Sequence, residues 1–172
     1  MMTALQALID NGVSWDTVKT VCDEAIDTDS FEDDDDKRCC IALAYDIDNG
    51  NEPDPSDYSV PHGMTVEGPY GEYRVLDDDE ADAAAKDYIE DSLWAFIPSF
   101  MSCETGIDES VFTALQDKCE GANDAVRSII DGSCGIDSFV ESAISADGRG
   151  HFLNTYDGEE REYGDYYVYR TN

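Results

Sequence analysis

Apolar residues recur every three or four positions in the first third of the chain, which is the spacing of one face of a helix. The pattern predicts a helix over 3–9 that Asn11 and Gly12 end, a second helix that Ser14 caps, and a third that begins at Asp33. The apolar faces of the second and third helices are predicted to consist of Val18, Val21, Cys22, Ala25, Cys40, Leu43, Ala44 and Ile47.

The middle of the chain changes from loop to hairpin to helix. Residues 49–61 hold two Pro-flanked acidic turns and few apolar side chains, so we expect a mobile surface loop there. Residues 64–66 and 73–76, joined by a turn at 68–71, predict a β-hairpin. A long helix follows over 77–97, which Pro98 ends or kinks, and another runs from Asp108 to Asp131.

The C-terminal part combines one short helix with two strands. Gly132 and Gly135 bracket a break before the helix, and 152–156 and 166–170 predict antiparallel strands around an Asp157–Gly158 turn. The predicted class is therefore α+β, mainly helical, with a small antiparallel sheet made by the central hairpin and the C-terminal strands. We expect a single domain over 1–172, with a helical part at 1–60 and the hairpin, helices and strands at 64–172.

Composition adds the strongest signal, which is an excess of acid. The 172 residues hold 41 Asp and Glu against 10 Lys and Arg, a formal net charge of -31 with a pI near 4.1. Direct binding to nucleic acid or to an anionic membrane surface is excluded, because both need basic residues. The expected partners are cations or basic proteins. Solubility needs a net charge of only about 2 to 8, so the excess indicates a further use.

Two acidic clusters are predicted to begin helices and to contact a partner. The runs at 33–36 and 77–80 fall in first turns, where the positive end of the helix favours carboxylates. Together with the acids further along the second of these helices, they would form a stripe comparable in pitch to a row of phosphates. The predicted partner-binding residues are Asp33, Asp34, Asp35, Asp36, Asp77, Asp78, Asp79, Glu80, Asp82, Asp87 and Asp91.

Membrane and secretory signals are missing from the sequence. No stretch approaches the roughly 18 apolar residues of a membrane span, and the N-terminus lacks the basic and apolar regions of a secretory signal. We therefore expect a soluble, cytoplasmic protein whose 6 cysteines are thiols. Cys22, Cys40 and Cys119 fall on apolar helical positions and are predicted to be buried, whereas Cys134 is predicted to be the most exposed.

No metal site or cofactor is predicted. Asp27 with Asp29, and Asp46 with Asp48 and Asn49, offer oxygen ligands for calcium, but neither stretch has the spacing of an EF-hand. The cysteines form no C-x-x-C pair, which argues against zinc.

One segment, 147–160, gathers the residue types of an active site. Asp147, Arg149, His151 and Asp157 stand among glycines, and His151 beside either aspartate would form an acid–base pair. The alternative interpretation is a glycine-rich turn in which Arg149 pairs with a carboxylate. We prefer the turn and predict no catalytic residue, because no activated nucleophile, phosphate-binding loop or metal cluster completes a site.

Three stretches carry a resemblance to known proteins: YRVLDDDEADAAAKDYIEDSLWAFIPSF at 73–100, CEGANDAV at 119–126, and ADGRGHFLNTYDGEE through YYVYRTN at the end. With these stretches, residues 73–172 resemble a group of acidic proteins of phages and mobile elements for which no activity is established. By analogy, the resemblance implies a DNA mimic that blocks restriction, CRISPR or another DNA-binding defence protein. It does not extend to the first 60 residues.

Charge and resemblance together predict a non-enzymatic inhibitor whose carboxylates occupy the nucleic-acid-binding surface of a basic host defence protein. A compact domain of this length spans on the order of 40 Å, and duplex DNA of that length carries about 24 phosphates. The charge of -31 is of the same size. Halophilic adaptation is an alternative that needs no partner, because Asp exceeds Glu and Lys is scarce. A small enzyme centred on His151 is the other alternative.

Overall fold

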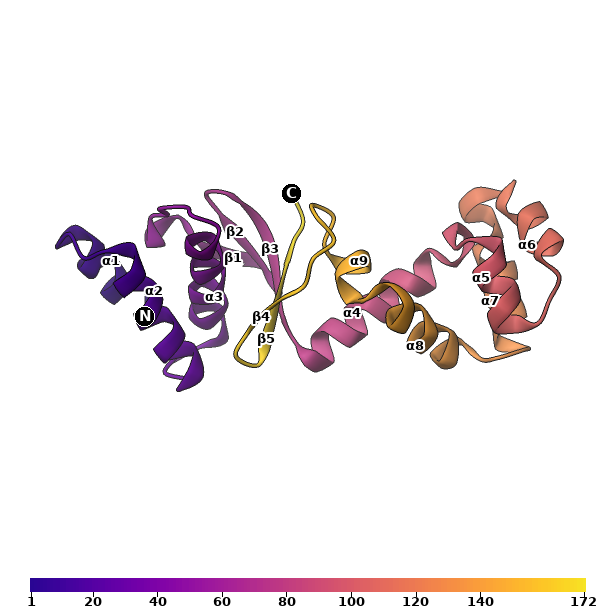
Figure 1. Cartoon of the computed structure of the whole chain (residues 1–172), viewed down its shortest axis with the longest axis horizontal. Coiled ribbons are helices and arrows are strands. Elements are labelled where there is room, and N and C mark those ends of the chain that lie inside the picture. The colour runs from indigo at the N-terminus through magenta and orange to yellow at the C-terminus, as the bar shows by residue number, and fades with distance from the viewer. The chain divides into compact units, whose positions relative to one another are not determined.

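The computed structural model describes residues 1–172, which form two compact units (Figure 1). The first unit consists of Met1–Ala81 and Leu153–Asn172, and the second consists of Asp82–Phe152. Along the sequence, the second unit is thus an insertion into the first. Nine α-helices and one antiparallel sheet of five strands confirm the predicted α+β class. The single domain over 1–172 stays a prediction.

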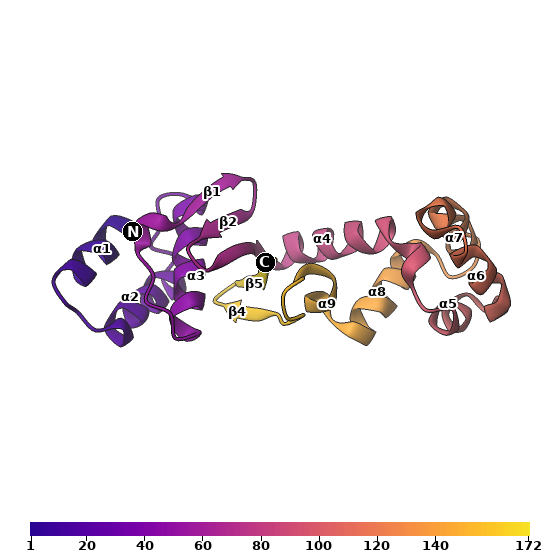
Figure 2. The ribbon, with the colours of Figure 1, turned by 90° about the horizontal axis from the view of Figure 1, so that it is seen from above.

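Three helices and the sheet form most of the first unit. The helices α1 (Met2–Asp10), α2 (Trp15–Asp27) and α3 (Asp34–Asp48) confirm the three predicted from the apolar period. Ser14 precedes α2 as predicted, although its hydroxyl lies 3.0 Å from that of Thr17 and makes no bond to the backbone. The helix α3 lies between the α1–α2 pair and the sheet (Figures 1 and 2). Because it has neighbours on both sides, every residue from Arg38 to Asp46 is buried.

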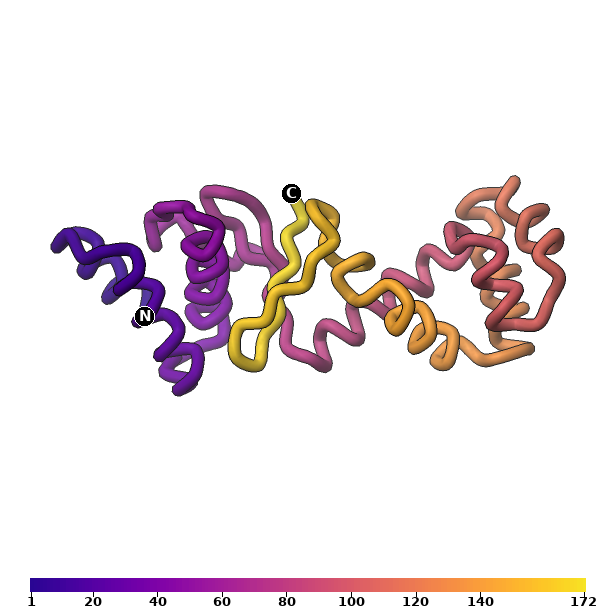
Figure 3. The backbone as a smooth tube through the Cα atoms, viewed as in Figure 1, coloured from indigo at the N-terminus to yellow at the C-terminus, as the bar shows by residue number.

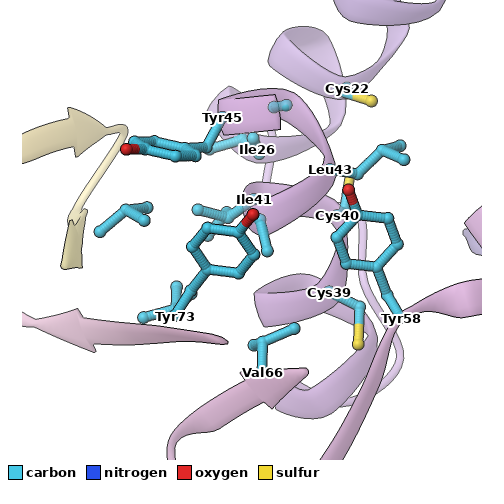
Figure 4. Close-up of a cluster of buried hydrophobic side chains, with 14 of the residues drawn as sticks. Cys22, Ile26, Cys39, Cys40, Ile41, Leu43, Tyr45, Tyr58, Val66 and Tyr73 are labelled. Carbon is cyan, nitrogen blue, oxygen red and sulfur yellow. The ribbon is translucent and has the colours of Figure 1, made fainter. Parts of the chain in front are cut away.

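The core of the first unit is built on both sides of α3 (Figure 4). Cys22 and Ile26 reach it from α2, whereas Val66 and Tyr73 reach it from the sheet. Complete burial of an apolar side chain of this size stabilises folding by about 1.5 to 3 kcal/mol. Since α3 takes part in both interfaces, it is the central element of this unit.

The sheet has the strand order β1-β2-β3-β5-β4, and all neighbouring strands are antiparallel. The predicted hairpin is confirmed as β2 and β3, which pair through Val66 and Tyr73. The predicted last strand is confirmed as β5, which lies beside β3, so the end of the chain returns to complete the sheet (Figure 3). The strands are β1 (Ser59–His62), β2 (Thr65–Gly68), β3 (Gly71–Asp77), β4 (Arg161–Tyr163) and β5 (Tyr166–Arg170).

The predicted strand at 152–156 is wrong, because Arg149–Leu153 form the short helix α9. Two adjacent apolar residues, Phe152 and Leu153, are compatible with either period, so the pattern could not separate helix from strand. The second hairpin instead joins β4 to β5 around Gly164. Gly164 has a φ of +59°, and a Cβ there would lie 2.8 Å from Ile26, so this turn requires glycine.

The predicted surface loop at 49–61 is wrong in its second half. It contains a 3₁₀ turn, η1 (Pro55–Asp57), and the edge strand β1, which pairs with β2. Tyr58 accounts for the difference, because its side chain is buried and its hydroxyl donates to Asp46 over 2.5 Å. One buried aromatic residue thus anchors a segment whose composition is typical of a loop.

The second unit is helical. The predicted helix after Gly135 is confirmed as α8. None of the helices in the chain is long and apolar enough to cross a membrane. The elements of this part are α4 (Asp78–Asp91), which begins in the first unit, η2 (Leu93–Ala95), α5 (Pro98–Thr105), α6 (Glu109–Gln116), η3 (Cys119–Ala122), α7 (Asn123–Asp131), α8 (Ile136–Asp147) and α9.

Both long helices predicted for this part are divided. The helix α4 ends at Asp91 and does not continue to 97, and Pro98 begins α5 where the prediction had it end a helix. Asp108 caps α6 as predicted, through the backbone N–H of Ser110. The helix α6 then ends at Gln116, and the φ of +49° at Cys119 prevents one α-helix from continuing to Asp131.

Side chains of the later helices replace backbone bonds that are lost where α4 ends. Asn123 donates to the carbonyl oxygen of Glu90 over 2.7 Å and accepts from the backbone N–H of Trp94 over 3.2 Å. Gln116 donates to the carbonyl oxygen of Phe96 over 2.8 Å. The apolar residues keep their helical spacing after Asp91, so the sequence pattern does not show that α4 ends there. The end of the helix is stabilised by polar side chains that lie far away in the sequence.

Candidate functional site

The first predicted acidic cluster begins α3 and is partly engaged inside the molecule. Asp33 caps the helix, because its side chain accepts from the backbone N–H of Asp36 over 2.8 Å. Asp36 is half-buried and binds the N-terminal ammonium at 2.6 Å. Asp34 lies 3.5 Å from the guanidinium of Arg38. Asp35 is exposed and makes no hydrogen bond or ion pair, so it is the free carboxylate of this cluster.

The second cluster forms a reciprocal cap at the start of α4. The backbone N–H of Glu80 donates to Asp77 over 2.8 Å, and the backbone N–H of Asp77 donates to Glu80 over 2.9 Å. Asp78 and Asp79 are exposed in the same turn. Stabilisation of the helix end is therefore a sufficient role for Asp77 and Glu80.

The acids further along α4 do not form the single stripe that the sequence predicts. At about 100° per residue, Asp82 and Asp87 point about 140° apart around the helix axis. Asp82 also pairs with Arg149 at 3.0 Å. Asp87 and Asp91 lie one turn apart, both exposed and without a hydrogen bond or ion pair. The predicted acids without an internal role are thus Asp35, Asp79, Asp87 and Asp91.

Other acids lie where helix electrostatics disfavours them. A carboxylate at a helix C-terminus faces the negative end of the dipole, at a cost of about 0.3 to 1 kcal/mol. None of the helices α1 to α8 has a basic residue in its last turn. Six of them end on an aspartate, namely Asp10, Asp27, Asp48, Asp91, Asp131 and Asp147. Asp10 and Asp131 form i,i+4 pairs within their helices, and Asp48 contacts Lys19 and Tyr163, so contacts within the chain leave only Asp27, Asp91 and Asp147 unexplained.

The net charge is concentrated in the first unit. This unit holds 27 acidic and 6 basic residues, a net charge of -21, whereas the second holds 14 acidic and 4 basic residues, a net charge of -10. The 10 basic side chains can balance the charge of only 10 of the 41 acids, so 31 negative charges remain uncompensated.

Arg38, which was not predicted as a site residue, is buried and contacts both acidic clusters through Asp34 and Glu80. Its guanidinium donates to the carbonyl oxygen of Val75, pairs with Glu80 at 2.8 Å and lies over the ring of Tyr166 at 5.3 Å. Burial lowers the pKa of Arg38, but the hydrogen bond and charge of Glu80 outweigh it, so the pKa is raised. Arg38 thereby joins the start of α3 to the end of β3. Its one sequence signal is a basic residue at the start of an apolar run.

Asp46, considered above for calcium, is a fully buried carboxylate in the core of the first unit. It accepts from the hydroxyls of Tyr58 and Tyr73 over 2.5 and 2.7 Å. Burial raises the pKa of Asp46, against the opposing effect of these hydrogen bonds, and burial also raises the pKa of both tyrosines. No group of three or more His, Cys, Asp or Glu side chains is arranged to hold a metal ion.

The side chains that the enzyme alternative needs do not form one hydrogen-bonded group. Arg149 pairs with Asp82, as the turn interpretation predicts for this arginine. Asp157 belongs to the first unit, where it accepts from the amide of Asn154 over 2.7 Å. His151 and Asp147 line the same groove but make no hydrogen bond to each other. The segment therefore does not form the acid–base pair that the enzyme alternative requires.

That groove, the aromatic groove, has a volume of about 560 Å³ and belongs to the second unit. The ring of Phe96 lies 5.8 Å from that of Phe100 and 6.2 Å from that of Phe152. The groove was not predicted from the sequence. A helix that continued to residue 97 would not have brought these aromatic rings together. Its main lining residues are Tyr88, Phe96, Ile97, Phe100, Asp147 and His151.

The cysteines are all free thiols, but their exposure differs from the prediction at two positions. Cys22 and Cys40 are buried as predicted. Cys119 is exposed, because the predicted helix that would have buried it does not continue through this residue. Cys134 is only partly exposed, less than Cys103 or Cys119, so its predicted rank as the most exposed is wrong.

Comparisons with known proteins give no relative from which a role could be transferred. No protein-family model, curated protein or solved structure matches the chain. The function is therefore inferred from the charge and geometry described above.

Proposed function

We propose that this chain is a non-enzymatic inhibitor from a phage or mobile element, whose carboxylates occupy the nucleic-acid-binding surface of a basic host defence protein. The observation that carries the proposal is the 31 negative charges that the basic side chains of the chain leave uncompensated. The helix-terminal aspartates Asp27, Asp91 and Asp147 support it, because they lower helix stability and make no hydrogen bond or ion pair within the chain.

The spacing of the free acids on α4 also supports mimicry. Asp87 and Asp91 are exposed and four residues apart, which is a rise of about 6 Å along the helix. Two phosphate steps along one DNA strand cover about 6.8 Å of the duplex axis. A row of Lys or Arg side chains that binds alternate phosphates of DNA would therefore find carboxylates at a similar spacing on α4. The net negative charge of the chain would also speed its association with a basic partner.

Competition for a captured partner tests this function directly. The chain is immobilised, its partner is captured from host lysate and identified by mass spectrometry, and duplex DNA is then added to the purified pair. Mimicry requires DNA and the chain to exclude each other from the partner. A ternary complex of chain, partner and DNA would contradict it.

Halophilic adaptation predicts a different response to salt. If the charge serves partner binding, the purified chain is expected to unfold cooperatively on heating at about 50 mM salt, with a higher Tm at about 1 M salt, where screening reduces self-repulsion. Near- and far-ultraviolet circular dichroism measure the transition. A tertiary signal that is lost in dilute buffer and recovered only in concentrated salt would favour halophily and count against the inhibitor.

A further inference from the structure

The aromatic groove of the second unit combines an apolar interior with exposed apolar side chains. Phe96, which lines the groove, packs edge-on against the buried Phe139 with ring centroids 5.2 Å apart. Ile97 and Tyr88 line it and are 65% and 47% exposed. A volume of about 560 Å³ lies within the range of ligand pockets. Exposed apolar side chains that lie together around a groove are typical of an interaction site, whereas single ones are ordinary on any surface.

The surroundings of the groove are negative. The helix α8 ends at Asp147, which lines the groove, and α4 ends at Asp91, next to the lining residue Ser92. The carbonyl end of a helix carries about half a negative charge, and each end here adds a carboxylate that makes no hydrogen bond or ion pair. No lysine or arginine lines the groove. Aromatic ring faces also attract cations, so an apolar ligand that carries positive charge fits best.

We propose that the aromatic groove receives a basic amphipathic helix of the partner protein. Its apolar side chains would insert among the rings, and its Lys or Arg side chains would lie beside Asp91 and Asp147. This inference rests on the proposed function, since it takes the partner to be a basic protein, and it adds an apolar anchor to an interface otherwise described by charge. A helix is favoured over a strand because the groove is lined by helices and their ends, with no strand edge to extend.

The test compares two exposed apolar residues of the second unit. Ile97→Asn removes an apolar side chain from the groove, and asparagine is favourable at the N-cap position of α5 that Ile97 occupies, so folding is not impaired. Val111→Asn is the matched control, because Val111 is 40% exposed on α6 and does not line the groove. Asparagine and valine have similar helix propensities, so the control also keeps its fold.

The probe is a fluorescent synthetic peptide of about 14 residues with leucine at i, i+3, i+4 and i+7 and lysine elsewhere. Binding to the full chain is measured by anisotropy at about 150 mM salt. We expect Ile97→Asn to weaken binding about tenfold and Val111→Asn to change it less than about twofold. A peptide of the same composition with scrambled leucines is expected to bind about tenfold more weakly, and one with glutamate in place of lysine is expected not to bind.

The contrary outcomes separate this inference from the proposed function. If the scrambled peptide binds as well as the ordered one and Ile97→Asn has no effect, charge alone accounts for binding, and the groove is overturned while the inhibitor is not. If the glutamate peptide binds as tightly as the lysine peptide, the groove takes apolar segments of any charge, which overturns the basic helix. If the lysine peptide does not bind but a captured partner does, the inference about the groove is overturned and the proposed inhibitor function is not.

Discussion

Replacing Asp46 with alanine is expected to lower the free energy of unfolding of the first unit by about 2 to 5 kcal/mol. The substitution leaves the buried hydroxyls of Tyr58 and Tyr73 without their acceptor, and each unsatisfied buried group costs about 1 to 3 kcal/mol. Urea unfolding followed by circular dichroism measures the change.

Asp48→Ala is the matched control for this change. Asp48 lies in the same helix and also accepts from a tyrosine, Tyr163, over 2.7 Å, but its side chain is 47% exposed. Its loss is expected to cost less than about 1 kcal/mol, because water replaces the exposed contact. If both alanine variants lose the same stability, burial is not the cause.

The pH dependence of an Asp46→Asn variant gives a second measure of the same site. Burial raises the pKa of Asp46 in the folded state above its usual 3.8, so the folded chain binds this proton more tightly than the unfolded chain does. The stability that this group contributes is therefore full below pH 3.8 and falls as the pH rises through the folded pKa. The stability of Asp46→Asn relative to the unaltered chain is expected to increase over that window. A relative stability that stays constant with pH would contradict the raised pKa.

Replacing Asp35, Asp79, Asp87 and Asp91 together with asparagine is expected to weaken partner binding and flatten its salt dependence. Each phosphate-like contact contributes about 0.9 to the slope of log affinity against log salt, so four contacts account for about a hundredfold change between 50 and 200 mM. Because these acids have no internal partner, the fold is expected to be unchanged by circular dichroism. Affinity for the captured partner, in competition with duplex DNA, is the measurement.

A second set with the same change in charge is the control. It replaces exposed acids of the second unit that were not predicted to bind, as Glu109→Gln, Asp117→Asn, Glu120→Gln and Asp124→Asn. A smaller loss in this set would support the predicted residues. If both sets lose the same affinity, the total negative charge matters and these four positions do not. If the affinity is unchanged and the salt response is flat in both sets, the mimic hypothesis is contradicted.

The elements that the sequence predicted correctly are those whose signals are local. The helix α3 follows from an apolar period together with Asp33, whose cap involves residues only three positions apart. The β2–β3 hairpin follows from two short strands and the turn between them. Because capping, turn formation and the period of one face act over a few residues, they can be identified without knowledge of the rest of the chain.

The elements that were missed depend on residues far apart in the sequence. The end of α4 at Asp91 is stabilised by Asn123, which binds the carbonyl oxygen of Glu90, 33 positions away. The strand β1 follows a tyrosine whose hydroxyl binds the buried Asp46. In both places the local pattern suits another structure, and a polar contact formed only in the folded chain decides the outcome.

The same division applies to the candidate sites. The sequence by itself determined the excess of 31 carboxylates, because the number of charges does not depend on the fold. Which carboxylates remain free was decided only by tertiary structure, since Arg38 reaches Glu80 across 42 positions and Arg149 reaches Asp82 across 67. The aromatic groove likewise exists because α4 ends early and turns Phe96 toward Phe152. Ion pairs and ring contacts form between whichever side chains meet in space, and the packing of the helices determines which ones meet.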